Sequence, residues 1–252
     1  MKIAFIGFGE AAGAFRESLA ATDPSLVFST YDILFDSEGP GGEVASRAAA
    51  AGVEAKPSAC AAVDGADWIV SAVTAASSLE AAQSVAPHVQ QGQVFVDINS
   101  VSPDRKRATA ALFAQAHVEY VDMAVMAPVH PRGHRTPTLV AGALTGPVTD
   151  ALTRLDFQFE RIDGEIGAAT AIKMVRSLFV KGLEAITVET LLAASASGCF
   201  DHILESLSKS YPGLNMPDLA RYQFDRTVKH GVRRAAEMRE SAATVEALGL
   251  TG

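Results

Sequence analysis

The chain has 252 residues, of which 48% are hydrophobic and 20% are charged, and its formal net charge is −8. This composition predicts a soluble globular protein, and the acidic balance argues against nucleic acid or a membrane as a partner. The two cysteines lie far apart without the spacing of a zinc site, so we expect a reducing, cytoplasmic compartment and neither disulfide nor metal. No segment approaches the roughly 18 apolar residues of a membrane span.

Short apolar runs alternate with alanine-rich helical stretches through the first half of the chain. This rhythm favours βαβ units and a parallel sheet that is buried on both faces. The expected strands are Lys2–Ile6, Leu26–Tyr31, Trp68–Val73, Val94–Ile98, Val118–Asp122 and Thr138–Ala141. The expected helices are Ala11–Ala21, Gly42–Ala51, Ser77–Ala86, Pro103–Gln115 and Val148–Leu155.

The pattern becomes entirely helical after about residue 163. Residues 167–195 contain no proline and space their apolar residues helically, which predicts one helix roughly 40 Å long. Further helices are expected at Phe200–Ser210 and Met216–Leu248. We therefore predict an α/β fold: a Rossmann-type doubly wound parallel sheet over residues 1–163, then a smaller all-α domain over residues 164–252 with a long interdomain helix. That domain is too small to bury such a helix alone, so we expect a homodimer or higher homo-oligomer.

A glycine-rich turn follows the first expected strand. Gly7, Gly9 and Ala12 occupy the three small-residue positions of G-x-G-x-x-G/A. In a dinucleotide site the first glycine permits the tight turn, the second lets the backbone approach the pyrophosphate, and the third residue keeps the helix close to the strand. The alternative is a flavodoxin-like turn that binds no dinucleotide. The predicted cofactor-binding residues of the turn are Gly7, Phe8, Gly9, Glu10, Ala11 and Ala12.

Asp32 ends the second expected strand. A carboxylate about 20 residues beyond the motif accepts hydrogen bonds from the adenosine ribose and repels a 2′-phosphate. Because Ile33 and Leu34 follow, without an arginine, the sequence favours NAD over NADP as the cofactor. The alternative is a solvated aspartate in a turn.

Two further strand ends are expected to face the cofactor, since ligands bind beyond the carboxyl ends of parallel strands. The first comprises Val73, Thr74 and Ala75, and the second begins with Asn99 and Ser100. Asn99 or Ser100 is expected to hydrogen-bond the nicotinamide side, and Ser100 is also a candidate for substrate binding. Ser102 and Pro103 that follow are typical of a helix start.

Three polar residues share one stripe of the long predicted helix. Lys173, Ser177 and Lys181 fall within about 80° of one another at 100° per residue. Lys173 is either a general acid/base or a solvated surface charge. The ordinary pKa of a lysine side chain is about 10.4, so base catalysis near neutral pH requires desolvation or a nearby positive charge, which an oxidised nicotinamide ring would supply.

Four segments together resemble one enzyme family, the β-hydroxyacid dehydrogenases, which include 6-phosphogluconate and 3-hydroxyisobutyrate dehydrogenases. The segments are GFGEAAG at 7–13, VDINSVSP at 96–103, VDMAVMAPV at 121–129 and GAATAIKMV at 167–175. The resemblance implies a nicotinamide cofactor and Lys173 as the general acid/base. Lys181–Gly182 and His230–Met238 resemble the branch that carries a DUF1932-type C-terminal domain.

The chain also departs from that family in two places. Ser177 stands where an asparagine is common, and the Ser-Gly-Gly that ordinarily binds a substrate carboxylate is absent after Met126. A basic group follows instead, either an anion-binding loop or a solvated one; it consists of His130, Arg132, His134 and Arg135. Ser177 remains a candidate for catalysis. The candidates for substrate binding are Ser100, Met126, His130 and Lys181.

The sequence leads to one hypothesis and two alternatives. The hypothesis is an NAD(P)-dependent dehydrogenase that oxidises a small anionic β-hydroxy acid, or runs the reverse reduction. An imine reductase is the first alternative, although such enzymes commonly place an acidic residue or a tyrosine where Lys173 stands. The second is a non-catalytic NAD-binding protein, which the retained Lys173 and Lys181 disfavour.

Overall fold

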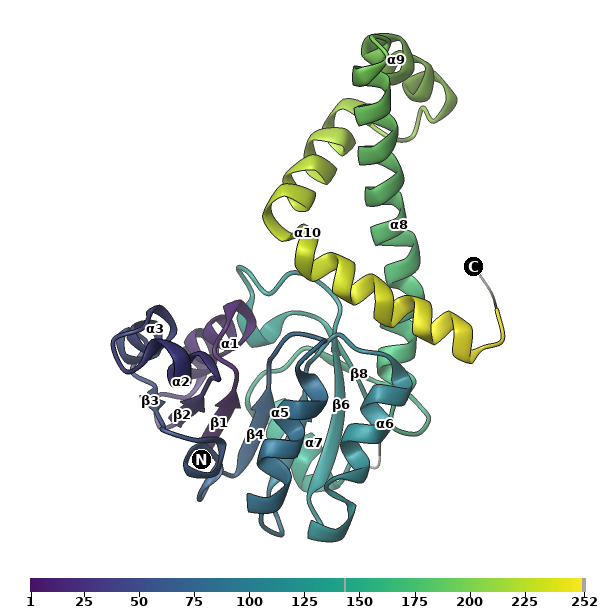
Figure 1. Ribbon diagram of the computed structural model, residues 1–252. Coiled ribbons are helices and arrows are strands. Elements are labelled where there is room, and N and C mark those ends of the chain that lie inside the picture. The colour runs from purple at the N-terminus through teal and green to yellow at the C-terminus, as the bar shows by residue number, and fades with distance from the viewer. Residues whose placement is uncertain (143, 251–252) are drawn as a thin grey trace. The chain divides into compact units, whose positions relative to one another are not determined.

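The computed structural model of the protein describes residues 1–142 and 144–250. The chain forms two compact units, Met1–Met174 and Val175–Gly252, and each is described by itself. Figure 1 follows the chain from the N-terminal strands in purple to the C-terminal helix in yellow. Among the described helices, none combines the length and hydropathy needed to span a bilayer.

The first unit is built on one eight-stranded sheet with the order β3-β2-β1-β4-β5-β6-β7-β8. The first six strands run parallel, and the β6–β7 pair is antiparallel, so that β7 and β8 run in the opposite direction. The strand order reverses between β1 and β4, which is the switch point where doubly wound sheets bind ligands. The strands are β1 (Lys2–Ile6), β2 (Val27–Tyr31), β3 (Glu54–Ala55), β4 (Trp68–Ser71), β5 (Val94–Asp97), β6 (Glu119–Val125), β7 (Thr138–Ala141) and β8 (Phe159–Arg161).

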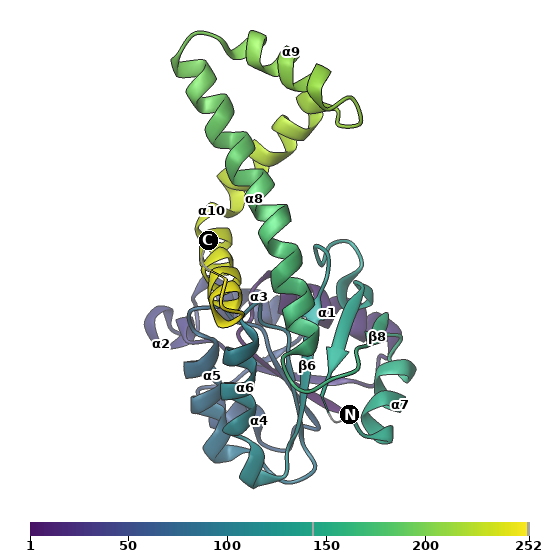
Figure 2. The ribbon, with the colours of Figure 1, turned by 90° about the vertical axis from the view of Figure 1, so that its right-hand side faces the viewer.

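Helices cover both faces of this sheet (Figures 1 and 2). They are α1 (Glu10–Thr22), α2 (Leu34–Glu38), α3 (Glu43–Ala50), α4 (Ala59–Val63), α5 (Ser78–Val85), α6 (Pro103–Ala111), α7 (Gly146–Arg154) and the first turns of α8 (Ala168–Ala196). Side chains alternate along each strand, so Ile3 and Phe5 pack beneath α1 and α7, whereas Ala4 and Ile6 pack beneath α4 and α5. Burial on both faces explains why these strands are almost wholly apolar.

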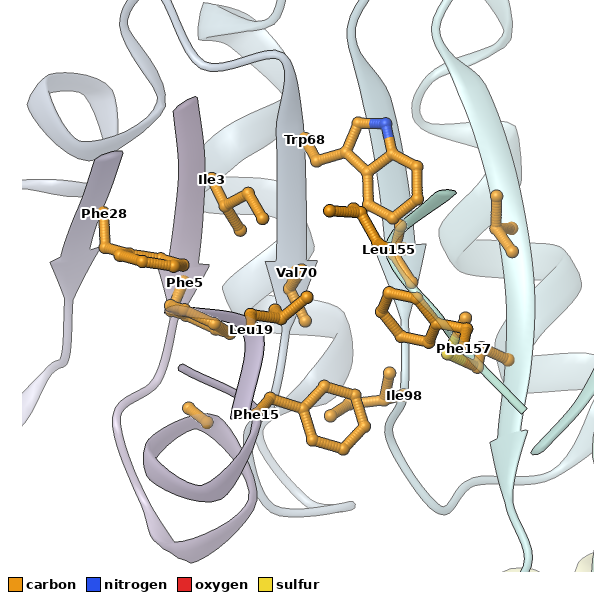
Figure 3. Close-up of a cluster of buried hydrophobic side chains, with 14 of the residues drawn as sticks. Ile3, Phe5, Phe15, Leu19, Phe28, Trp68, Val70, Ile98, Leu155 and Phe157 are labelled. Carbon is orange, nitrogen blue, oxygen red and sulfur yellow. The ribbon is translucent and has the colours of Figure 1, made fainter. Parts of the chain in front are cut away.

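Aromatic side chains make up much of the core on the α1 face (Figure 3). Phe15 of α1 meets Phe157 edge to face, with ring centroids 6.2 Å apart. Phe5 stacks on Phe28 of the neighbouring strand at 6.2 Å. Phe15 and Leu19 of α1 belong to the same buried cluster as Phe5, and this cluster packs α1 against the sheet.

The second unit consists of the remainder of α8, α9 (Phe200–Ser210) and α10 (Met216–Ala247). Polar pairs join α8 to α10: the ammonium of Lys181 lies 2.9 Å from Oε2 of Glu237, and Nε of Arg234 donates to Oε1 of Glu184 at 2.8 Å. Burial of the Lys181 side chain lowers its pKa below the ordinary lysine value, against the opposing effect of Glu237. Large apolar side chains of this unit stand exposed, including Phe179, Ile186, Val228 and Val232.

The predicted fold class is confirmed, and each predicted strand and helix has a counterpart within a few residues. The third predicted strand ends earlier than expected, at Ser71, because the backbone N–H of Val73 donates to a side chain, that of Asn99, instead of to the sheet. The contacts divide the chain at Met174/Val175 rather than at 163/164, because the first turns of α8 bond into the first unit. The sequence did not predict α2, α4, β3 or β8.

Candidate functional site

The turn after β1 requires glycine at its first position for the protein's own packing. Gly7 has φ +84°, and a Cβ on it would lie 2.7 Å from both the carbonyl oxygen of Ala72 and Cγ1 of Val73. Its N–H donates to the carbonyl of Tyr31 at 2.8 Å. The turn therefore packs tightly between the residues that follow β4 and the end of β2.

Gly9 differs from Gly7, because no described residue other than its own chain neighbours has an atom within 4 Å of the position of its Cβ. It is the N-cap residue of α1 and offers no side chain to the first amides of the helix. Open space in front of an uncapped helix N-terminus is what a pyrophosphate requires. Ala12 is fully buried against the sheet, as the third position of the motif demands. The residues present thus fit a dinucleotide.

Asp32 is bonded to the same turn. Its Oδ2 accepts a hydrogen bond from the N–H of Phe8 at 2.8 Å, and its Oδ1 accepts one from the N–H of Leu34 at 3.0 Å. Nη2 of Arg47 donates to the carbonyl oxygen of Phe8 at 2.6 Å, so both backbone polar groups of Phe8 are held. These bonds argue against a merely solvated aspartate. A carboxylate has about four acceptor positions, so Asp32 keeps capacity for a ribose diol.

The ends of β4 and β5 are joined through Asn99, which is 3% exposed. Its Oδ1 accepts from the N–H of Val73 at 2.8 Å, and its Nδ2 donates to Oγ of Ser71 at 2.9 Å. Asn99 therefore braces the two strand ends beside Gly7, a role that the sequence did not reveal. Of the other predicted contacts at the end of β4, Thr74 is exposed and Ala75 is buried.

Two of the predicted residues meet at the start of α8. Nζ of Lys173 donates to Oγ of Ser100 at 2.7 Å, and both side chains are partly buried. Ser100 lies in the loop after β5, at the carboxyl edge of the sheet where the glycine turn also lies. The structure thus places an amine and a hydroxyl, residues 173 and 100, at the edge where a nicotinamide ring is expected.

A side chain from β6 holds the first turn of α8 in place. Oδ2 of Asp122 accepts hydrogen bonds from the N–H groups of Gly167 and Thr170, at 3.0 and 3.2 Å. A carboxylate at this position also complements the positive end of the helix dipole. Oγ1 of Thr170 in turn donates to the carbonyl of Val101 at 2.9 Å, which ties α8 to the loop that carries Ser100.

Four polar side chains of the first unit form what we call the buried charge cluster: Asp97, Lys106, Tyr120 and Asp122. Nζ of Lys106, which is 0% exposed, lies 3.0 Å from Oδ1 of Asp97 and 3.6 Å from Oδ1 of Asp122. The hydroxyl of Tyr120 donates to Oδ2 of Asp97 at 2.6 Å. Burial, and secondarily the charge of Asp97, raises the pKa of Tyr120 well above its ordinary value, so the phenol stays a donor.

This cluster was not predicted from the sequence, although a signal was present. Asp97 ends an otherwise apolar strand and Asp122 interrupts a mostly apolar one, each time in the dipeptide Val-Asp. An aspartate buried in such a strand needs a cation or several donors. No pattern, however, distinguishes Lys106 from the other basic residues of α6.

The basic loop after β6 is divided between structural and exposed residues. The ring of His134 is 0% exposed, with Nε2 2.7 Å from the carbonyl oxygen of Leu155 and Nδ1 2.7 Å from Oγ of Ser18. Arg135 forms an ion pair with Asp156 at 2.7 Å. The anion-binding and the solvated interpretations were both wrong for His134, because its buried ring bonds the protein itself, whereas for the exposed Arg135 anion binding stays a prediction.

Three of the remaining predicted residues follow β6 in the first unit. His130 and Arg132 are exposed, and Met126 is half-buried against the cluster that includes Ala124 and Leu139. Ser177 and Lys181 belong to the second unit, where both are buried. Within the described part of the chain, no group of three or more His, Cys, Asp or Glu residues could hold a metal ion.

Comparison with known proteins matches both ends of the chain to known families. Residues 2–101 match the family described as NADP oxidoreductase, coenzyme F420-dependent, and residues 194–252 match a domain of unknown function, DUF1932. An uncharacterised 28.5 kDa protein of Methanothermus fervidus is 27% identical over 240 residues, which cover 95% of this chain and 89% of the relative.

Two solved structures extend this similarity. A conserved hypothetical protein from Sinorhizobium meliloti 1021 is 38% identical, covering 100% of this chain and 84% of that one, with a TM-score of 0.74. The conserved protein MTH1747, described as structurally similar to 3-hydroxyacid dehydrogenases, is 29% identical, covering 98% and 90%, with a TM-score of 0.69. The fold is shared by two more distant structures. One is a 3-hydroxyisobutyrate dehydrogenase from Salmonella typhimurium, with 18% identity, 100% of this chain and 89% of that one covered, and a TM-score of 0.72. The other is an imine reductase from Myxococcus stipitatus, with 19% identity, 91% and 78% covered, and a TM-score of 0.61.

The sheet order, the glycine turn and the strand ends that surround it define a Rossmann-type α/β protein with a C-terminal helical unit. Within that class, the chain belongs to the β-hydroxyacid dehydrogenase-like family, in the branch with a DUF1932 domain.

Proposed function

We propose that the protein is an NAD(P)-dependent oxidoreductase that oxidises a small anionic β-hydroxy acid, or reduces the corresponding carbonyl, with Lys173 as the general acid/base. The observation that carries the proposal is the 2.7 Å hydrogen bond from Nζ of Lys173 to Oγ of Ser100 at the carboxyl edge of the sheet. The match of residues 2–101 to an NADP oxidoreductase family and the similarity of MTH1747 to 3-hydroxyacid dehydrogenases support it.

The glycine turn is the proposed binding site of the cofactor's pyrophosphate. The open space at Gly9 and the uncapped start of α1 support this assignment. When bound, the nicotinamide supplies the hydride acceptor or donor. Asp32 would accept hydrogen bonds from the ribose diol and disfavour a 2′-phosphate, which makes NAD the proposed cofactor and NADP the alternative.

Lys173 would exchange a proton with the substrate hydroxyl. To accept that proton, its amine must be neutral, and a positive charge near an ammonium favours loss of the proton. Ser100, as the hydrogen-bond acceptor of Nζ, would keep the amine directed toward the edge of the sheet. The proton acceptor and the cofactor would then meet at one strand edge, as a near-attack geometry requires.

The substrate is proposed to carry an anionic group. His130 and Arg132 are exposed basic side chains of the loop after β6 and are the candidates to bind that group, whereas the exposed Arg135 is paired with Asp156. Ser177 stays a proposal for catalysis, and Lys181 stays one for substrate binding.

The test is a panel of small hydroxy acids, including phosphorylated and aromatic ones, offered with NAD and with NADP and followed by absorbance of the reduced ring. Lys173→Ala should reduce turnover of an active substrate by about 10²-fold or more, the scale of general acid–base catalysis, and should leave NADH binding unchanged. Lys209→Ala removes an exposed lysine from α9 and serves as the matched control. Full activity of Lys173→Ala would refute the role of the lysine.

The shared fold with an imine reductase favours one competing activity. Cyclic imines belong in the same panel, with NADH and NADPH as reductants. Reduction of imines without turnover of any hydroxy acid would refute the dehydrogenase proposal and identify an imine reductase. Binding of NADH with turnover of neither class would instead indicate a non-catalytic NAD-binding protein.

A further inference from the structure

The loop that carries Ser100 and the helix that carries Lys173 are both bonded to the buried charge cluster. Asp97 holds the loop, since its Oδ1 accepts the N–H of Asn99 at 2.9 Å. Asp122 holds the helix through the N–H groups of Gly167 and Thr170. The ammonium of Lys106 lies between the two carboxylates and also donates to the backbone carbonyl of Asp97 at 2.6 Å.

The charges of the cluster couple the bond between Asp97 and the loop to the bonds between Asp122 and α8. Two carboxylates in an apolar sheet repel each other unless a cation lies between them. Lys106 supplies that cation, and the hydroxyl of Tyr120 satisfies the far oxygen of Asp97. Replacing a buried ion pair by apolar residues of similar volume is often neutral or stabilising, so stability alone is a weak explanation for three charges buried here.

We propose that the buried charge cluster positions the Lys173–Ser100 pair, with Lys106 as its central positioning residue. The loop and the start of α8 are held in one register by Asp97, Asp122 and the hydrogen bond from Thr170 to Val101, and this register keeps Nζ of Lys173 on Ser100. The catalytic consequence rests on the proposed function, whereas the positioning itself does not.

The readout is the chemical reactivity of one amine. Acetic anhydride acylates neutral amines, and peptide mass spectrometry reports the rate at each lysine from about pH 7 to about pH 11, a range that includes the ordinary lysine pKa of about 10.4. A merely structural role for the cluster would change the stability of the fold but not the labelling of Lys173 in folded protein. Lys209, exposed on α9, provides the internal standard.

The main variant is Thr170→Val, which removes the hydroxyl that bonds Val101 and adds no charge. Its matched control is Thr109→Val, because Thr109 lies on α6, is as deeply buried, and finds no hydrogen-bond partner for its Oγ1 among the described residues. We expect labelling of Lys173 to rise about two- to tenfold in Thr170→Val, the equivalent of one lost hydrogen bond, and to stay at the wild-type rate in Thr109→Val. Equal rates in the two folded variants would overturn the proposal.

Lys106→Met tests the ammonium directly. In folded protein the same increase at Lys173 is expected, and an unchanged rate would contradict the role of Lys106. If this variant does not fold, Tyr120→Phe takes its place, because it removes the hydroxyl that bonds Asp97 and keeps the ring; an unchanged rate at Lys173 in this variant would then overturn the proposal. Because labelling needs neither cofactor nor substrate, its result is independent of the proposed function, which fails separately if the panel of hydroxy acids gives no turnover or if Lys173→Ala is fully active.

Discussion

The carboxylate of Asp32 accepts a hydrogen bond from the N–H of Phe8 at 2.8 Å, which joins the end of β2 to the glycine turn. One residue therefore shapes the turn and is also the proposed acceptor for the adenosine ribose. The same bond makes the residue testable, because asparagine retains an acceptor oxygen but loses the negative charge.

Asp32→Asn should shift cofactor preference toward NADP. The loss of charge removes repulsion of the 2′-phosphate and weakens the bonds to the ribose diol, so the ratio of NADPH to NADH affinity should rise about tenfold or more, the scale of one hydrogen bond to a charged group. Fluorescence titration with each reduced nucleotide measures the ratio. Asp36→Asn, a neighbouring carboxylate bonded to Tyr31, is the control and should leave the ratio unchanged.

Gly9→Ala should keep the fold and lose the nucleotide. Apart from the chain neighbours of residue 9, no atom of the described residues lies within 4 Å of the new methyl group, so the unfolding temperature should stay near the wild-type value. The methyl group would, however, occupy the approach to the pyrophosphate, and NADH affinity should fall at least about tenfold. Gly13→Ala, also in open space but inside α1, should bind NADH normally and gain up to about 1 kcal/mol in stability. Normal NADH binding by Gly9→Ala would show that the cofactor does not bind at this turn.

The parts of the fold that could be predicted are those with a local signal. β1, β4 and β5 are buried along nearly their whole length, so their apolar runs identified them. β3 and β8 were missed because their residues are mostly exposed, and their strand conformation comes from pairing with β2 and β7 rather than from burial of their own side chains.

The same distinction applies to the candidate site. The glycine turn and Lys173 belong to short motifs, and the structure places Lys173 on Ser100, a residue 73 positions away. The cluster around Lys106 could not be predicted, because a lysine that is 0% exposed contradicts the usual expectation for that residue and its partners come from two separate strands. The structural role of His134 was hidden for a similar reason, since Ser18 is 116 positions away.

His134 should make the stability of the protein depend on pH. Burial lowers the pKa of His134 below its ordinary value, so the folded state binds this proton less readily than the unfolded state. As the pH falls below the unfolded pKa of about 6.5, the unfolded state takes up the proton first, and the free energy of unfolding decreases. His134→Gln should lose this part of the decrease. Denaturant unfolding at about pH 7.5 and about pH 5.5 gives the change in the free energy of unfolding for the wild type and for His134→Gln. An equal decrease in the two proteins would contradict the prediction.

The exposed apolar side chains of the second unit should be covered by a second copy of the chain. Val228 and Val232 of α10 are 84% and 91% exposed, and an apolar surface of this kind marks a contact site. We expect light scattering to report at least a dimer, and Val232→Glu to weaken it about tenfold or more, because a charge would be buried in the interface. Ala49→Glu places the same charge on exposed α3 of the first unit and serves as the control. A monomeric wild-type protein, or Val232→Glu that assembles as well as Ala49→Glu, would show that this face stays open to solvent.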